Sequence, residues 1–279
     1  MNNFTENNED SEINIVDCVC CWFDLLGFGK PFMDAEWNLK NDKCKIQLKR
    51  IKDLNSGLSG FYALTTGKSL TLNDGAIFNY DIDKSKEHLI IETIYFIDNL
   101  INDFESVNYR DLNSGHPGAR GIITYGHRYN YSFANTTTST AHQDFVSYHP
   151  KEFQMNTAFS KAYLMESAGS KSGISGNHLF FDNYLLSTIE QLITEKHGKN
   201  SIFKVTRERN SNEMSFTVHK KDTRLIKLKF KNKEIGFEKH GIKTTLYEFI
   251  NKESIQDDMA HEYEYRRAVA ISQMENESE

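Results

Sequence analysis

Several residue types and patterns are scarce in this chain of 279 residues, and each scarcity excludes a class of protein. Only three prolines and four cysteines occur, so neither a proline-rich linker nor a disulfide framework is expected. No uncharged apolar run approaches the ~18 residues that a membrane-spanning helix requires. Residues 1–12 are acidic and amide-rich without a basic segment, which argues against a secretory signal. We therefore expect a cytoplasmic protein that has no membrane partner.

Common cysteine and histidine motifs are also missing. Cys18, Cys20 and Cys21 lie within one apolar run, Cys44 stands alone, and no C-x-x-C pair occurs. Neighbouring side chains on a strand point to opposite faces, so Cys20 and Cys21 cannot both face one metal ion. We expect reduced thiols that pack as small hydrophobic residues. The histidines show no zinc-binding spacing, and neither a complete P-loop nor a G-x-S-x-G turn is present.

The residues that are present indicate a globular α+β protein. Hydrophobic residues make up 38% and charged residues 26% of the chain, and the net charge is -6. Apolar patterns predict strands at 13–23, 61–66, 69–80 and 120–131, and helices at 34–55, 87–104, 153–167 and 184–196. Asn73-Asp74-Gly75 divides 69–80 into a hairpin, because Asp-Gly between apolar segments favours a tight turn. We expect a disordered tail at 1–12 and a polar loop, containing His142 and His149, at 136–151.

The C-terminal part, residues 196–279, has a different pattern. Strands at 202–208, 214–220, 225–230 and 234–239 are predicted to form an antiparallel meander, followed by an acidic helix at 244–273. Lysines alternate with apolar residues over 224–231, which is typical of a sheet with one solvated face. A nucleic-acid contact is the alternative interpretation, and we do not expect one. We expect residues 196–279 to pack on the same domain as residues 13–195.

Two aspartates are candidates for binding cations. Asp24 ends the first predicted strand, directly before Leu-Leu-Gly-Phe-Gly, and Asp74 lies at the hairpin tip. Mg²⁺ takes one or two carboxylates from protein and completes its shell with water and phosphate. The glycine turn at 25–29 can present backbone N–H groups to a triphosphate. The alternative is that both aspartates only end a strand and form a turn.

Four segments resemble class III nucleotide cyclases, and they occur in the order of that family within residues 14–185. They are 19–28 (VCCWFDLLGF), 72–76 (LNDGA), 120–126 (RGIITYG) and 159–166 (FSKAYLME). The last two are similar in particular to the bacterial Pycsar pyrimidine cyclases of antiphage defence. The resemblance implies that 13–195 is a cyclase-homology domain with a ferredoxin-like antiparallel sheet covered by helices. The extra C-terminal strands and terminal helix would be added to it.

The resemblance also implies roles for individual residues. Asp24, Leu25 and Asp74 would hold two divalent cations, Mg²⁺ or Mn²⁺. The residues implied to bind nucleotide are Leu26, Gly27, Phe28, Gly29 and Asn156, and those implied to act in catalysis are Arg120, Lys161 and Ser160. Family geometry suggests that Asp24 and Arg120 serve one site from opposite subunits. The alternative for Arg120 is that it only pairs with a carboxylate beside its strand.

The chain departs from the purine-specific members of that family at three positions. Leu70 stands where they have an adenine-reading lysine. Ser160 and Leu164 stand where they have the asparagine and arginine that stabilise the transition state. The first change favours a pyrimidine nucleotide or an altered base pocket. The other two mean that Arg120, Lys161 or Asn156 must stabilise the transition state, or that the domain is inactive.

Two functions therefore remain open. The first is an enzyme that converts UTP, in preference to CTP, into a 3′,5′-cyclic mononucleotide and pyrophosphate as a second messenger of antiphage defence. Class III sites form between two catalytic domains and this chain has one, so the expected partners are a second copy of the chain and a downstream cyclic-nucleotide effector protein. The second is a catalytically silent cyclase-homology module that binds a nucleotide or a partner.

Overall fold

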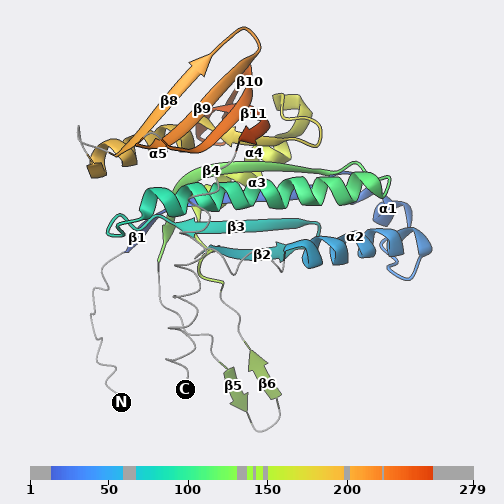
Figure 1. Ribbon diagram of the computed structural model, residues 1–279. Helices are drawn as coiled ribbons and strands as arrows, with labels where there is room; N and C mark the ends of the chain where they lie inside the picture. Colours follow the sequence, from blue (N-terminus) through green and yellow to red (C-terminus); the bar gives the residue numbers. More distant parts are fainter. Residues whose placement is uncertain are drawn as a thin grey trace, which may run out of the picture.

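A long mixed sheet organises the part of the chain that the computed structural model describes, which is residues 14–58, 67–130, 137–140, 143–146, 150–197, 202–221 and 223–253. Nine of the strands in these ranges form the sheet, in the order β2-β3-β1-β4-β7-β11-β10-β9-β8 (Figure 1). The strands are β1 (Ile15–Leu25), β2 (Lys68–Leu72), β3 (Gly75–Asp81), β4 (Ala119–Tyr129), β7 (Leu179–Asp182), β8 (Phe203–Arg209), β9 (Glu213–Lys220), β10 (Thr223–Lys239) and β11 (Ile242–Glu253). All neighbours pair antiparallel except β4 and β7, which run parallel.

The helices divide between the two faces of this sheet. They are α1 (Lys30–Asp34), α2 (Asp42–Leu58), α3 (Leu89–Asn113), α4 (Thr157–Ala168) and α5 (Asn183–His197), with a short 3₁₀ turn η2 (Gly169–Ser172) after α4. The apolar residues of α2, α3 and α5 share one core with the sheet, and those of α4 share a second core on the other face. The α+β class predicted from the sequence is thus confirmed.

The alternation of side chains along β1 explains the two cores. Cys20 and Trp22 belong to the core under α4, whereas Cys21 and Phe23 belong to the core on the opposite face. The approach of α4 also requires Gly126 on β4, because a Cβ there would lie 2.7 Å from the backbone nitrogen of Ala158. All four cysteines are buried and free, as expected.

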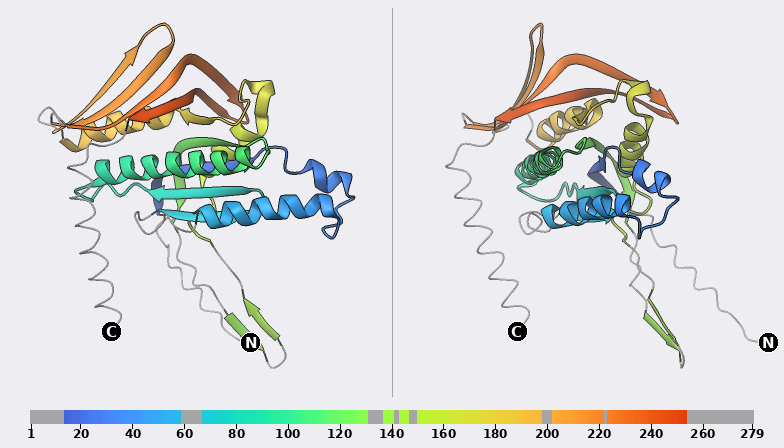
Figure 2. Two further views of the ribbon diagram at one scale, coloured as in Figure 1. Left: turned by 45° about the vertical axis from the view of Figure 1, so that its right-hand side comes forward. Right: turned by 90° about the vertical axis from the view of Figure 1, so that its right-hand side faces the viewer.

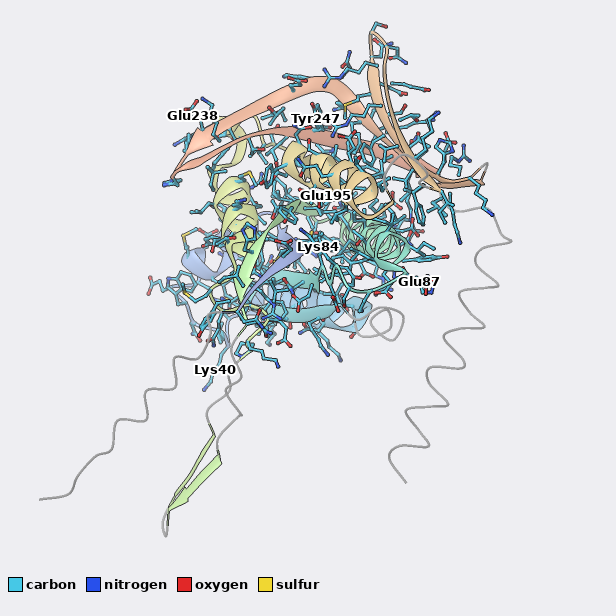
Figure 3. The ribbon with its side chains drawn as sticks, turned by 90° about the vertical axis from the view of Figure 1, so that its left-hand side faces the viewer. Lys40, Lys84, Glu87, Glu195, Glu238 and Tyr247 are labelled. Carbon is cyan, nitrogen blue, oxygen red and sulfur yellow. The ribbon has the colours of Figure 1, made fainter. Side chains whose placement is uncertain are left out.

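The C-terminal strands extend the same sheet. β11 pairs with β7 through Leu246 opposite Asp182, and β10 pairs with β11 and β9. Figure 2 shows that β8 to β11 arch over α5 and α3. In Figure 3, Glu238 and Tyr247 lie on this arch, while Lys40, between α1 and α2, lies on the opposite side of the molecule.

Three secondary-structure predictions were wrong in part. The predicted strands 225–230 and 234–239 are one strand, β10, with an irregular register between Phe230 and Glu234. The terminal helix is wrong over 244–253, which belong to β11, because alternate residues such as Leu246 are buried against neighbouring strands. The expected loop at 136–151 contains two short strands, β5 (Thr137–Thr140) and β6 (Gln143–Val146), which pair with each other.

The predicted helix 34–55 is also interrupted. Residues 35–41 separate α1 from α2, and Glu36 and Trp37 have φ values of 51° and 61°. The side chains of Asn38 and Asn41 accept hydrogen bonds from the backbone N–H groups of residues 40 and 43. Such asparagine turns compete with the helix for backbone donors.

Some predictions lie outside the described residues. They are the tail at 1–12, the strand at 61–66, and the part of the terminal helix beyond residue 253. Within the described ranges, no helix is both long enough and apolar enough to span a membrane.

Candidate functional site

The two candidate metal aspartates meet at one end of the sheet. The strand register places Asp24, at the end of β1, between Gly75 of β3 and Arg120 of β4. Asp74 lies in the tight turn between β2 and β3, and its carbonyl oxygen accepts a hydrogen bond from the Leu25 backbone nitrogen at 3.0 Å. The antiparallel pairing thus brings together two residues fifty positions apart in the chain, as well as Leu25.

Both carboxyl groups lie where negative charge is disfavoured. The pKa of Asp24 is raised to about 7, mainly by burial and then by the charges of Glu166 and Asp74, while Arg120 and Arg50 act against the rise. The pKa of Asp74 is raised as well, mainly by burial. A divalent cation would relieve this unfavourable charge.

The donor set at this end fits Mg²⁺ or Mn²⁺. Within the described ranges, no group of three or more His, Cys, Asp or Glu side chains could enclose a metal ion. Mg²⁺ prefers one or two protein carboxylates and fills its remaining coordination positions with water and phosphate. Asp24 and Asp74 therefore fit the cations that the sequence resemblance implies.

The glycine turn follows Asp24 directly. Leu26 donates its backbone N–H to the Gly118 carbonyl oxygen at 2.9 Å, and Gly27 has a φ of 67°, which favours glycine. Phe28 is buried, and its ring lies 5.0 Å from that of Phe32 between centroids. Phe28 anchors the turn, Gly27 is exposed, and a Cβ at Gly29 would meet nothing within 4 Å. The turn that follows Asp24 is therefore open to a ligand at Gly27 and Gly29.

Arg120 is held by a buried carboxylate. Its Nε and Nη2 lie 2.8 and 2.5 Å from Oε1 of Glu166 on α4, and Nη1 lies 3.4 Å from the Ile174 carbonyl oxygen. The side chain of Arg120 is 15% exposed and that of Glu166 is 5% exposed. Arg120 thus pairs with a carboxylate beside its strand, as the alternative interpretation predicts. The pair is not on the surface, however, and Arg120 lies opposite Asp24. Its catalytic role stays a prediction.

The register contradicts the expectation that Asp24 and Arg120 serve one site from opposite subunits. The two residues are direct partners across the β1–β4 pair of a single chain. Antiparallel partners share a face of the sheet with Cα atoms ~5 Å apart. They therefore belong to the same half of any shared site.

Lys161 lies in a different place from Asp24. Its Nζ donates to the Tyr125 carbonyl oxygen at 3.1 Å and lies 5.2 Å from the ring centroid of Tyr184. Tyr125 is five residues from Arg120 along β4, which corresponds to ~17 Å in a strand. Within one chain, Lys161 and Asp24 are not brought together.

Ser160 and Asn156 also lie away from Asp24, and their side chains already have partners. The Oδ1 of Asn156 caps α4 by accepting the Phe159 backbone N–H at 2.9 Å, and its Nδ2 donates to Oδ1 of Asn79 at 2.7 Å. Ser160 Oγ donates to the Asn156 carbonyl oxygen at 3.0 Å. Asn156 thus stabilises the start of α4 as its N-cap, and Ser160 is bonded within its own helix.

Sequence reasoning missed Glu166 and Arg50, whose charges act on the pKa of Asp24, and Asp111, the ion-pair partner of Arg50. Arg50 on α2 and Asp111 on α3 form an ion pair of 2.7 Å with side chains only 3% and 7% exposed. One signal could have placed Arg50 in the interior. Arg50 shares a helix face with Cys44 and Leu54, which are buried.

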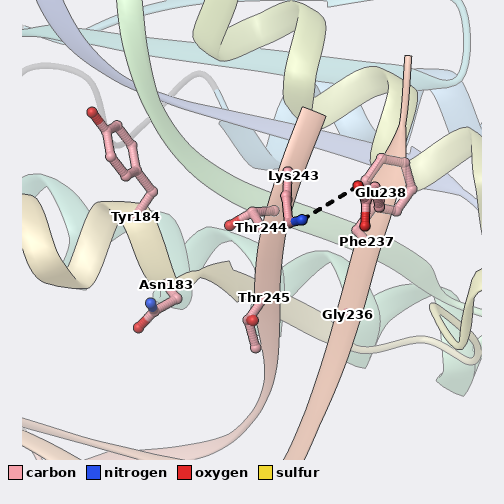
Figure 4. Close-up of a pocket in the computed structure, with 8 residues that line it drawn as sticks. All are labelled: Asn183, Tyr184, Gly236, Phe237, Glu238, Lys243, Thr244 and Thr245. Atoms are coloured by element: carbon pink, nitrogen blue, oxygen red, sulfur yellow. Dashed lines mark hydrogen bonds and ion pairs between the residues drawn. The ribbon is translucent and has the colours of Figure 1, made fainter. Parts of the chain in front are cut away.

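A separate groove of about 600 Å³ lies beside the start of α5 and the β10–β11 hairpin (Figure 4). Lys243 contacts Glu238 across it at 3.4 Å. The lining residues are Asn183, Tyr184, Gly236, Phe237, Glu238, Lys243, Thr244 and Thr245. Its rim includes Tyr184, so this groove lies at the Lys161 end of the sheet and away from Asp24.

Comparison with known proteins gives matches only among solved structures. No protein-family model and no curated protein sequence matches the chain. The adenylyl cyclase CyaB from P. aeruginosa has a TM-score of 0.46 and 10% identity, over 88% of this chain and 99% of that chain. The guanylyl cyclase Cya2 has a TM-score of 0.40 and 10% identity, over 88% and 95%. The guanylate cyclase domain of RhGC from Catenaria anguillulae, in complex with GTP, has a TM-score of 0.39 and 10% identity, over 86% and 100%.

Proposed function

We propose that this chain is a nucleotide cyclase that uses two divalent cations, Mg²⁺ or Mn²⁺, held by Asp24 and Asp74. The observation that supports it most is the meeting of these two half-buried carboxylates beside an open glycine turn. The cyclase-like segments of the sequence carry both aspartates and the turn. The substrate is a nucleoside triphosphate.

The residues of the chain bind and orient the substrate. Asp24 and Asp74 hold the cations, which when bound lower the pKa of the ribose 3′-hydroxyl and neutralise the triphosphate. The turn residues after Leu26, Gly27–Gly29, offer backbone N–H groups to the phosphates. The 3′-oxygen attacks the α-phosphorus, the bond from that phosphorus to the bridging oxygen of the β-phosphate breaks, and pyrophosphate leaves with that oxygen. The hydroxyl proton passes to solvent.

Arg120 and Lys161 are the candidate cations for the charge that develops on the leaving group. Arg120 lies opposite Asp24 and lowers its pKa, so its charge reaches the same end of the sheet. Lys161 on α4 contacts β4 at Tyr125, five residues from Arg120, so in a homodimer Lys161 and its neighbour Ser160 would serve the site of the partner copy. Such charge stabilisation is a large part of phosphoryl-transfer catalysis.

A pyrimidine nucleotide, UTP before CTP, is the proposed substrate. Leu70 is half-buried against the core under α4 and has no group that could read the amino edge of adenine. The product would be a 3′,5′-cyclic mononucleotide that signals to an effector protein in antiphage defence, in line with the Pycsar-like segments at 120–126 and 159–166.

One observation favours the second candidate, a silent nucleotide-binding module. The guanidinium of Arg120 is engaged by Glu166, and Ser160 Oγ is engaged by its own helix. In a silent module, both groups would serve only the packing of α4. A silent module would keep the nucleotide site and lack turnover.

Incubation of the purified protein with each of the four NTPs and Mn²⁺ separates the candidates. Pyrophosphate and a cyclic product from UTP, in excess of the products from the other three, support the proposal. Nucleotide binding without turnover of any NTP supports the silent module.

A further inference from the structure

Arg50 lies at the centre of a buried polar network that connects helices α2 and α3 with the glycine turn and the loop before β4. Its Nε and Nη2 donate to the two carboxylate oxygens of Asp111 at 2.8 and 2.7 Å, and Nη1 donates to Oε1 of Gln47 at 2.9 Å. Nη2 also lies 3.2 Å from the carbonyl oxygen of Leu26. Almost every donor of the guanidinium is therefore used, and one bond reaches the glycine turn itself.

Asp111 carries the network to the loop before β4. Its Oδ2 accepts the Gly118 backbone N–H at 2.9 Å, and the Gly118 carbonyl oxygen accepts the Leu26 backbone N–H at 2.9 Å. Leu26 is thus held at both its N–H and its C=O, one through Gly118 and one through Arg50. Asp24 and Arg120 lie two residues from Leu26 and Gly118 respectively.

The side chain next in the turn is held as well. The Arg50 guanidinium lies 5.9 Å from the ring centroid of Phe28, which is buried. A cation at this distance from an aromatic face is attracted to it. Arg50 therefore contacts the turn on both sides of Gly27, the exposed residue between them.

We infer that Arg50 is a positioning residue that fixes the turn Leu26–Gly29 in the shape that receives the triphosphate. This inference rests on the proposed function. Arg50 does not touch the substrate; it acts through Leu26, Phe28 and Asp111. A lysine cannot replace it, since an ammonium group does not reproduce the planar fork that holds two carboxylate oxygens and a carbonyl.

The chain contains a matched control. Arg128 and Asp81 also form a two-bond ion pair, at 2.7 and 2.5 Å, and the Arg128 side chain is 4% exposed. This pair lies at the other end of the same strands, since Arg128 is eight residues from Arg120, or ~26 Å along β4. Loss of either pair is expected to lower stability, but only the first pair contacts the turn.

The test uses double variants, because a single change would leave a buried charge unpaired and the chain could unfold. Arg50→Met with Asp111→Asn is compared with Arg128→Met with Asp81→Asn. We expect the first variant to raise the KM for the NTP about tenfold or more with a smaller change in kcat, the pattern of lost binding. We also expect amide hydrogen exchange at residues 26–29 to be about tenfold faster or more, since opening of the turn becomes easier. The Arg128 variant should leave both quantities close to wild type.

Two results with the double variants would overturn the inference. One is unchanged hydrogen exchange at 26–29 in the Arg50 variant, and the other is an equal KM increase in both double variants. In the single variant Arg50→Lys, we expect values of KM and of hydrogen exchange at 26–29 between those of wild type and of the Arg50 double variant. Wild-type values of both quantities in Arg50→Lys would contradict the inference. If wild type turns over no NTP, the proposed function fails, and the exchange measurement still decides whether Arg50 holds the turn.

Discussion

Asp24 is placed where its charge costs stability. Burial, Glu166 and Asp74 raise its pKa to about 7 from 3.8. The folded state then binds the proton more tightly than the unfolded state. The stability that this group contributes is therefore present below pH ~4 and is lost as the pH rises through 7.

The first prediction follows from this pKa. In EDTA, we expect Asp24→Asn to raise the melting temperature at pH 8 by several degrees, because the variant removes a half-buried charge. At pH 5 the difference from wild type should be small, since wild-type Asp24 is then protonated. Thermal melts followed by circular dichroism at both pH values test it. The same difference at pH 5 and pH 8 would contradict the raised pKa.

The second prediction concerns the Arg120–Glu166 pair. We expect Arg120→Ala to lower turnover by ~10²-fold or more, the scale for losing one positioned donor. To separate an effect of Arg120 itself from one of an unpaired Glu166, the double variant Arg120→Met with Glu166→Gln is measured too. If Arg120 acts on the reacting phosphates, the double variant stays as slow as the single one. Recovery of wild-type turnover in the double variant would reduce Arg120 to a partner of Glu166, and Lys161 would become the next candidate.

At the residue scale, the sequence predicted the groups with a local signature and missed those that only tertiary packing defines. Asp24 before the glycine turn and Asp74 at Asn-Asp-Gly could be read directly. Glu166 could not be linked to Arg120, because forty-six positions separate them and only the packing of α4 on β4 joins them. Asn156 was predicted to bind nucleotide, and the structure places it as the cap of α4.

At the element scale, helix α2 shows why a periodic pattern can suggest the wrong face. The apolar residues Ile46 and Leu48 are 55% and 39% exposed, whereas Cys44 and Leu54 face the core with Arg50. The buried face combines the apolar Cys44, Leu54 and Leu58 with the polar Gln47 and Arg50, so hydrophobicity alone does not reveal it. The hairpin β2–β3 was predicted well, because its turn chemistry is local and Asn73 adopts the left-handed conformation it requires.

The third prediction tests how this hairpin holds Asp74. A Cβ at Gly75 would lie 2.0 Å from Cη2 of Trp22 and 2.7 Å from the Phe23 carbonyl oxygen. We therefore expect Gly75→Ala to cost about 1–3 kcal/mol of stability and to weaken Mn²⁺ binding by displacing Asp74. Free Mn²⁺ is measured by electron paramagnetic resonance. Gly236→Ala on β10 is the control, because a Cβ there meets nothing within 4 Å. Unchanged melting temperature and Mn²⁺ affinity in Gly75→Ala would show that the hairpin adjusts freely.

At the scale of the whole molecule, the described C-terminal strands belong to the same sheet as the N-terminal ones. β7 joins β4 in parallel and β11 in antiparallel pairing, and β8 to β11 arch over α5 and α3. The sequence predicted a meander of short strands, but β10 and β11 are long and continuous. Their join to β7 depends on a pairing across more than sixty residues, such as Leu246 with Asp182, which local patterns do not encode.

The fourth prediction concerns the proposed homodimer. Asp24 and Arg120 lie at the same end of the sheet within one chain. Lys161 contacts β4 at Tyr125, five residues from Arg120. Mixed dimers of Asp24→Ala and Lys161→Ala chains should therefore regain part of the activity, since one of their two sites is complete. Mixed dimers of Asp24→Ala and Arg120→Ala chains should stay inactive. Activity in the second mixture and none in the first would contradict this assignment of the two halves.

The central claim is that Asp24 and Asp74 together support cyclisation of a nucleoside triphosphate. The direct measurement is the mass-spectrometric yield of cyclic nucleotide from wild type, Asp24→Asn and Asp74→Asn with Mn²⁺ and each NTP. Asp83→Asn, in the exposed segment after β3, is the control. We predict cyclic UMP and pyrophosphate from wild type and from the control, and none from the other two variants, which remain folded. Full yield from Asp24→Asn or Asp74→Asn, or no cyclic product from wild type with any of the four NTPs, would contradict the claim.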